Sequence, residues 1–276
     1  MPTPSRPSTF VRWLEPLVSG LWILFFLWSV LVAVIWTFDI GEAEVHRAIH
    51  DPDLAAAILW ILNSLDVFWL LLAVANVHLA ISSSEGLAIA RRRALICLSS
   101  GWVLGAAAAA FSDIGYTGRL GMRLGEVPLG APLLWMAVAL GSRECALRIL
   151  PKARYEIVAA VAGLIALATD LNLEPVAQRL RVWWIWHLGV HTRVRVTAQA
   201  PEFGSRVLSW ILRPSGVTEL SWPPILNFVV WFAGPAILTL AFRETVVRDR
   251  SREFPRPIIV FLVLNVVFLL GHIPDR

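Results

Sequence analysis

The sequence is poor in charged residues and contains a single lysine, Lys152. Charged residues make up 16% of the 276 positions and hydrophobic residues 57%, whereas a soluble globular protein has about 25% charged residues. Three uncharged stretches reach the length of about 20 residues that crosses a hydrocarbon core; they are 17–38, 94–112 and 222–242. This composition excludes a water-soluble protein and predicts a polytopic membrane protein.

The residues and motifs that several membrane chemistries need are also missing. Cys97 and Cys145 show no CxxC spacing, which argues against a disulfide framework, an iron–sulfur site and a thiolate zinc site. Lys152 lies among charged residues and is not placed to form the Schiff base of a retinal protein inside a late helix. The absence of a DDxxD, Walker A or GxGxxG motif removes support for a prenyltransferase, nucleotide-driven transport and a dinucleotide cofactor.

Histidine is too sparse for a di-iron centre. The six histidines include two pairs at i,i+4 spacing, His46/His50 and His187/His191. Membrane di-iron enzymes use larger clusters of histidine ligands, so we interpret these pairs as structural or solvated. We therefore expect neither a metal nor a cofactor.

The apolar stretches predict an all-α fold, a single membrane domain of about seven transmembrane helices. The expected spans are 17–38, 54–81, 94–112, 127–142, 155–170, 223–242 and 257–273.

Arginine and lysine predict the orientation, because cytoplasmic loops carry an excess of both. Fourteen of these residues lie at the N-terminus and after the second, fourth and sixth spans, and four lie in the opposite short segments. We therefore predict that the N-terminus is inside and the C-terminus outside, in a bacterial or archaeal cytoplasmic membrane. The arginines form short blocks between apolar spans, which argues against nucleic acid as a partner.

The outer segment 171–222 is too long for a simple connection. It contains five tryptophans, which are Trp183, Trp184, Trp186, Trp210 and Trp222. Tryptophan is enriched at membrane interfaces, so one interpretation is an interfacial aromatic belt. The other is a re-entrant or surface-lying cap over a cleft that lipid can enter.

Two carboxylates occur close together at the end of the fifth span. Asp170 and Glu174 share one helical face if the helix continues, although Pro175 ends or kinks a helix nearby. Two carboxylates in one poorly hydrated site favour a state in which one holds a proton and the other acts as a base. The alternative is that both are solvated at a helix end.

The predicted topology brings further polar residues to the same membrane face. The third span ends at Asp113 and the sixth begins before Asn227, on the side where the fifth span ends. Asp113, Asp170, Glu174 and Asn227 are therefore expected at one leaflet, beside the tryptophan-rich segment. This combination predicts an acid site that faces lipid.

The sequence around these residues resembles the integral-membrane carotenoid biosynthesis family, which includes membrane-embedded carotenoid 1,2-hydratases. The resemblance runs from about Ala106 to Trp231, and its motifs keep the family's order and spacing. They are Phe-Ser-Asp113-Ile-Gly-Tyr116-Thr-Gly, Leu-Gly-Glu-Val-Pro128, Pro132-Leu-Leu-Trp, Asp170-Leu-Asn-Leu-Glu174-Pro-Val-Ala, Trp183-Trp184-Ile-Trp186 and Pro-Pro-Ile-Leu-Asn227-Phe-Val-Val-Trp231. The family usually carries glutamate where Asp113 stands. The resemblance implies addition of water to an acyclic carotenoid held in the membrane lipid.

The residues suggest how the implied hydration would proceed. A protonated carboxyl, with Asp170 as first candidate, protonates the terminal double bond. Glu174 or Asp113 then takes a proton from a water molecule that Asn227 positions. The tertiary cation is expected beside aromatic faces; the candidate substrate-binding residues are Tyr116, Trp183, Trp184, Trp186 and Trp231.

Two other functions remain open at this stage. One is a non-enzymatic lipid or carotenoid carrier, or a subunit that docks other carotenogenic enzymes. The other is a small transporter with a proton path through Asp66 and Asp113, although no inverted repeat supports it. Asp66 lies near the middle of the second span, and pairing with Asn63 or with another helix is the simpler interpretation.

Overall fold

The computed structural model describes residues 14, 16–24, 27, 52–111, 114–116, 120–175, 177, 183–186, 194–195, 219–220, 223–243, 259 and 265. The main helices are α3 (Pro52–Glu85), α4 (Leu87–Phe111), α5 (Gly130–Ile149), α6 (Tyr155–Pro175) and α8 (Ile225–Ala241). The strands are β1 (Ile114–Tyr116), β2 (Arg123–Leu124), β3 (Val127–Pro128), β4 (Trp184–Trp186), β5 (Val194–Arg195) and β6 (Glu219–Leu220).

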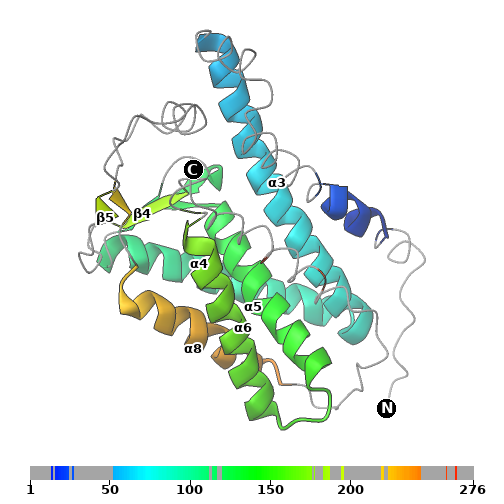
Figure 1. Cartoon of the computed structure of the whole chain (residues 1–276). Helices are drawn as coiled ribbons and strands as arrows, with labels where there is room; N and C mark the ends of the chain where they lie inside the picture. The colour runs from blue at the N-terminus through cyan, green and yellow to red at the C-terminus, as the bar shows by residue number, and fades with distance from the viewer. Residues whose placement is uncertain are drawn as a thin grey trace.

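Helix α5 lies in the middle of the bundle and packs against α3, α4, α6 and α8 (Figure 1). Nearly every side chain from Pro132 to Ala146 is buried, so this helix is covered on all sides, as expected of a core helix. It runs from Gly130 to Ile149 rather than over the expected 127–142. The prediction stopped at Arg143 because charge ends an apolar stretch, but the helix continues and buries that arginine.

The predicted helical fold is confirmed for the described residues, whereas the seven predicted spans are not confirmed. Among the described residues, three helical segments are long and apolar enough to cross a membrane: Asp66–Glu85, Leu87–Phe111 and Tyr155–Glu174. A shorter apolar helix covers Ile225–Ala241. The first expected span is described mainly over 16–24, where it is helical, and the last lies almost entirely outside the described residues.

The first helical segment packs against α3. The rings of Trp22 and Trp69 stack with their centroids 6.1 Å apart. Ser19 Oγ donates a hydrogen bond of 2.9 Å to Asn76 Oδ1. Asn76 is therefore a buried polar residue whose hydrogen-bond partner lies on another helical segment.

A single glycine separates α3 from α4, where the sequence suggested a loop over 82–93. Gly86 has a φ of 96°, a left-handed conformation that glycine adopts without steric cost. Its N–H donates to Ser82 O at 3.0 Å and its carbonyl accepts from Ala90 N at 3.1 Å. The chain therefore changes direction at one residue, and both helices extend beyond their apolar stretches.

Helices α6 and α8 cross at very short distance. A Cβ placed on Gly163 of α6 would lie 2.6 Å from the carbonyl oxygen of Phe232 in α8, so only glycine allows this approach. The contact fixes the middle of α6 against the middle of α8.

Three short antiparallel strand pairs supplement the expected all-α fold: β1 with β4, β2 with β3, and β5 with β6. In the first pair Ile114 lies opposite Trp186 and Tyr116 opposite Trp184. The strands have two or three residues each, too few for an alternating pattern to be recognised in the sequence.

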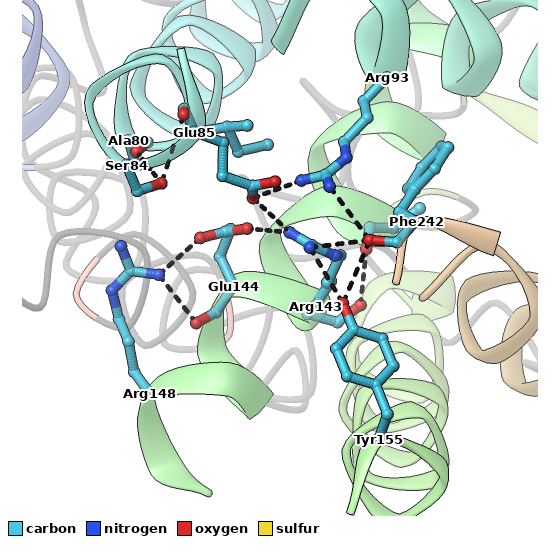
Figure 2. A network of polar contacts seen from close by, with 12 residues as sticks. Ala80, Ser84, Glu85, Arg93, Arg143, Glu144, Arg148, Tyr155 and Phe242 are labelled. Atoms are coloured by element: carbon cyan, nitrogen blue, oxygen red, sulfur yellow. Dashed lines mark hydrogen bonds and ion pairs between the residues drawn. The ribbon is translucent and has the colours of Figure 1, made fainter. Parts of the chain in front are cut away.

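A buried ion network connects the end of α3, the beginning of α4 and the end of α5 (Figure 2). Arg143 of α5 contacts Glu85 Oε1 at 3.1 Å and Glu144 Oε1 at 2.5 Å. Arg93 of α4 also pairs with Glu85, and Arg148 contacts Glu144 Oε2 at 2.6 Å. The sequence predicts that these three arginines lie in loops and set the orientation. In the structure each of them forms a buried ion pair.

The same network caps the end of α8. The carbonyl oxygen of Phe242 accepts hydrogen bonds from Arg93 at 3.0 Å, from Arg143 at 3.2 Å and from the Tyr155 hydroxyl at 3.2 Å. Carbonyls at a helix C-terminus lack partners within the helix and attract cations. The network thus ties α3, α4, α5, α6 and α8 together at one face of the bundle.

Replacing Arg143 by methionine is expected to lower the free energy of unfolding by about 3–5 kcal/mol, because two buried carboxylates lose a counter-charge. Reversible unfolding in mixed micelles measures the change. Arg154→Met is the matched control, since its 3.6 Å contact with Glu156 is largely exposed and is worth at most about 1 kcal/mol. Equal effects of the two substitutions would contradict the structural role of the network.

Candidate active site

The last turns of α6 carry two buried carboxylates. Helix α6 continues to Pro175 instead of stopping at 170, so Asp170 and Glu174 lie one turn apart on the same face. Asp170 is 0% exposed and Glu174 is 3% exposed. The alternative of two solvated carboxylates does not describe them.

Asn227, in the first turn of α8, joins the two carboxylates. Its Nδ2 lies 3.0 Å from Asp170 Oδ2 and 3.4 Å from Glu174 Oε1. An amide nitrogen has two hydrogens, so one group donates to both acids. The amide carbonyl oxygen of the same side chain is a hydrogen-bond acceptor.

Strand β4 supplies two more donors to Glu174. The indole nitrogens of Trp184 and Trp186 each lie 3.2 Å from Glu174 Oε2. Residues two apart on a strand point to the same side, which brings both indoles to one carboxylate. Pairing of β4 with β1 holds this arrangement at the end of α4.

A cavity of about 220 Å³ opens beside these groups. Six of the predicted site residues line it, and they are Tyr116, Glu174, Trp184, Trp186, Asn227 and Trp231. Apart from their polar atoms the walls are apolar, with Gly101, Leu104, Gly105 and Ala108 on α4 and Leu226 and Val230 on α8. The cavity can hold an apolar group against one carboxylate and one amide.

Asp170 and Glu174 differ in their position relative to the cavity. Asp170 is not among the residues that line the cavity, and its Oδ1 is buried without a hydrogen-bond partner among the described residues. Glu174 is therefore the carboxylate that faces the cavity, and Asp170 is linked to it through the shared amide of Asn227.

Tyr116 adds a phenol to the polar end of the cavity. Its hydroxyl oxygen would lie 3.2 Å from a Cβ placed on Gly105, and Val127 Cγ1 would lie 3.0 Å from the same point. Burial, followed by the charge of Glu174, raises the pKa of Tyr116 to about 12. The phenol therefore keeps its proton at neutral pH and can act as a hydrogen-bond donor.

Trp183 lies elsewhere than the sequence analysis expected. Its indole nitrogen donates to Asp66 Oδ2 of α3 at 3.0 Å, its backbone N–H donates to Ala177 O at 2.7 Å, and it does not line the cavity. Asp66 thus has a partner in the tryptophan-rich segment. Through Trp183 it anchors the beginning of β4.

Asp113 falls outside the described residues. Phe111 before it and Ile114 after it both line the cavity.

Trp135 is a cavity residue that the sequence analysis did not select. Its ring lies between two glycines: a Cβ on Gly101 would be 2.8 Å from Trp135 Cδ1, and one on Gly234 would be 2.5 Å from Cη2. The ring is tilted against Trp231 at 5.1 Å, and its indole donates to Ser100 Oγ at 3.1 Å. Glycines on separate spans carry no sequence signal that they face the same tryptophan, so this contact was not predictable.

No group of three or more histidine, cysteine, aspartate or glutamate side chains in the described part of the chain is arranged to hold a metal ion.

Replacing Asp66 by leucine is expected to destabilise the protein by about 1–3 kcal/mol, because the buried indole N–H of Trp183 loses its acceptor. Asp66→Asn retains an oxygen acceptor and is expected to cost less. Unfolding in mixed micelles provides the comparison, with Trp183→Phe as the partner substitution. The Asp66→Leu/Trp183→Phe double variant should lose less than the sum of the two single losses, and strict additivity would contradict the coupling.

Comparison with known proteins is consistent with this arrangement. Neither the search of curated proteins nor the search of solved structures found a match. Residues 58–194 match the sequence model described as carotenoid biosynthesis protein. The match contains both carboxylates of α6 and the tryptophans of β4, whereas Asn227 and Trp231 follow it. The chain belongs to the carotenoid biosynthesis protein family.

Proposed function

We propose that this protein adds water to the terminal double bond of an acyclic carotenoid or a related polyisoprenoid within the bilayer. The observation that carries the proposal is that Glu174 lines a largely apolar cavity and accepts hydrogen bonds from three donors. An apolar chain fits the walls, and the carboxyl supplies the acid that an unactivated alkene requires.

The reaction begins with proton transfer from a carboxyl group. Asp170 and Glu174 hold one proton between them, since two adjacent buried carboxylates do not both ionise readily. Glu174 lines the cavity, so we assign the transfer to Glu174 rather than to Asp170, the first candidate from sequence. Its proton forms a C–H bond at the less substituted carbon, and the neighbouring carbon becomes a tertiary cation.

The charge that develops on Glu174 meets donors already in place. Trp184, Trp186 and Asn227 point N–H groups at its oxygens, which favours the carboxylate as it forms without reorganisation of the site. The carboxylate and the indole faces in turn stabilise the cation.

Addition of water completes the reaction. The oxygen of a water molecule bonds to the tertiary carbon, and its excess proton returns to a carboxylate. Glu174 can take this proton, and Asp113 is the second candidate. The carbonyl oxygen of Asn227 can accept a hydrogen bond, and we assign it to orient the water. The product is a tertiary alcohol, and no electrons are transferred.

We also propose the complete topology of seven transmembrane helices, with the N-terminus inside. The ion network supports the assignment of the connections after α3, after α5 and after α8 to one face, because Glu85, Tyr155 and Phe242 meet there. The acid site then lies at the outer face.

The proposal is tested by expressing the chain in a host that makes lycopene and analysing the pigments by mass spectrometry. We expect products heavier than lycopene by one water molecule per modified end. Glu174→Gln is expected to reduce their formation by about 10²–10⁴-fold, because it removes the acid, and Asp170→Asn should also suppress it. Glu156→Gln is the control, an exposed carboxylate at the other end of α6.

The same experiment separates hydration from a binding role. A carrier or docking subunit needs the cavity but not the acids. If the combined Asp113→Asn, Asp170→Asn and Glu174→Gln variant keeps both carotenoid binding and the pigment composition of the wild type, hydration by this site is wrong.

A further inference from the structure

The polar groups of the cavity lie at one level of the bundle. Glu174 is at the end of α6, Asn227 is at the beginning of α8, and Tyr116 follows the end of α4. Ends of membrane-spanning helices mark the boundary of the hydrocarbon core. Any group that reaches Glu174 must therefore come to one face of the membrane.

The apolar part of the cavity extends from this level toward the middle of the membrane. Its walls on α4 run from Phe111 to Gly101, which corresponds to about 15 Å along a helix. This is roughly half of a hydrocarbon core of about 30 Å. Trp135 and Trp231 lie at the inner part, where Leu104 and Val230 are half-buried wall residues.

The volume limits how much of a chain is enclosed. An engineered cavity of about 150 Å³ accommodates one benzene molecule. A cavity of about 220 Å³ therefore encloses about one or two five-carbon units. The rest of a carotenoid must remain outside it, among the lipids.

We infer that the site takes one end of a linear polyisoprenoid at a time, from one leaflet only, with the remaining chain leaving between Leu104 of α4 and Val230 of α8 into the bilayer. This inference rests on the proposed function and adds a rule for two-ended substrates. The second end of a membrane-spanning chain lies at the opposite face, where the described residues form the ion network and no second acid site.

The two ends are therefore modified in separate binding events. After the first hydration the molecule must be released and must reverse its direction in the membrane. Reversal moves a new hydroxyl group through the hydrocarbon core, which is unfavourable because the hydroxyl loses its hydrogen bonds to water. The singly hydrated product is expected to accumulate.

The test compares intact membranes with detergent micelles. Membranes from an expression host contain the protein in one orientation and are loaded with lycopene, whose two ends are identical. Half of the sample is dissolved in mild detergent, which removes the distinction between leaflets. At equal consumption of lycopene, the doubly hydrated share is expected to be several-fold higher in micelles.

Each outcome of this comparison has a separate meaning. Equal shares in membranes and micelles, or mainly doubly hydrated product in membranes, would overturn the single-leaflet inference while hydration stands. No hydrated product in either sample would instead reject the proposed function.

A pair of variants tests the path of the chain. Leu104→Trp narrows the cavity and is expected to raise the KM for lycopene several-fold, with a smaller change in kcat, because the acid site is distant. Val103→Trp places the same side chain on the neighbouring residue, which is 57% exposed and does not line the cavity, and should leave KM unchanged. An unchanged KM in a folded Leu104→Trp variant would overturn the assigned path.

Discussion

A carboxylate kept in an apolar setting must be surrounded by hydrogen-bond donors, and this requirement organises the region where α6 ends and α8 begins. Glu174 receives N–H groups from two tryptophans of β4 and one asparagine of α8. The strand and the helix that carry these donors are positioned by separate contacts. Strand β4 is positioned by its pairing with β1 and by the bond between Trp183 and Asp66, and α8 is positioned by its close crossing with α6 at Gly163. Segments far apart in sequence thus converge on one side chain.

Helix α5 connects this region to a chemically different one. Its first half contributes Ala131, Leu134 and Trp135 to the cavity, and its second half contributes Arg143, Glu144 and Arg148 to the ion network. The end with the candidate active site has few charges and leaves Asp170 Oδ1 without a partner among the described residues. At the other end of α5, the charged side chains of the ion network form close pairs. One face of the bundle is thus built for stability, while the other retains an incompletely satisfied acid pair of the kind found at reactive sites.

Asp170, Glu174 and Asn227 could be predicted to lie at one face because successive spans cross the membrane in alternating directions. The prediction needs only the number of spans between these residues. It could not reveal which carboxylate faces the cavity, since that depends on the rotation of α6 against α8. The apolar pattern also placed five helices near their observed positions, with ends that differ where charges are buried. Arg143 was interpreted as the end of a span because its partners Glu85 and Tyr155 come from other helices. Pairing across distant segments has no signature in a single sequence.

The ion network has a consequence for the order of biogenesis. Arg93, Arg143 and Arg148 are among the cations from which we predict the orientation, yet in the folded protein they are paired with Glu85 and Glu144. A cation can direct insertion only while it is exposed to the cytoplasmic side. The orientation of each helix must therefore be decided before the bundle closes. Once the network has formed, it stabilises the orientation of the connected helices. Inverting any of them would require its buried charges to separate within the membrane.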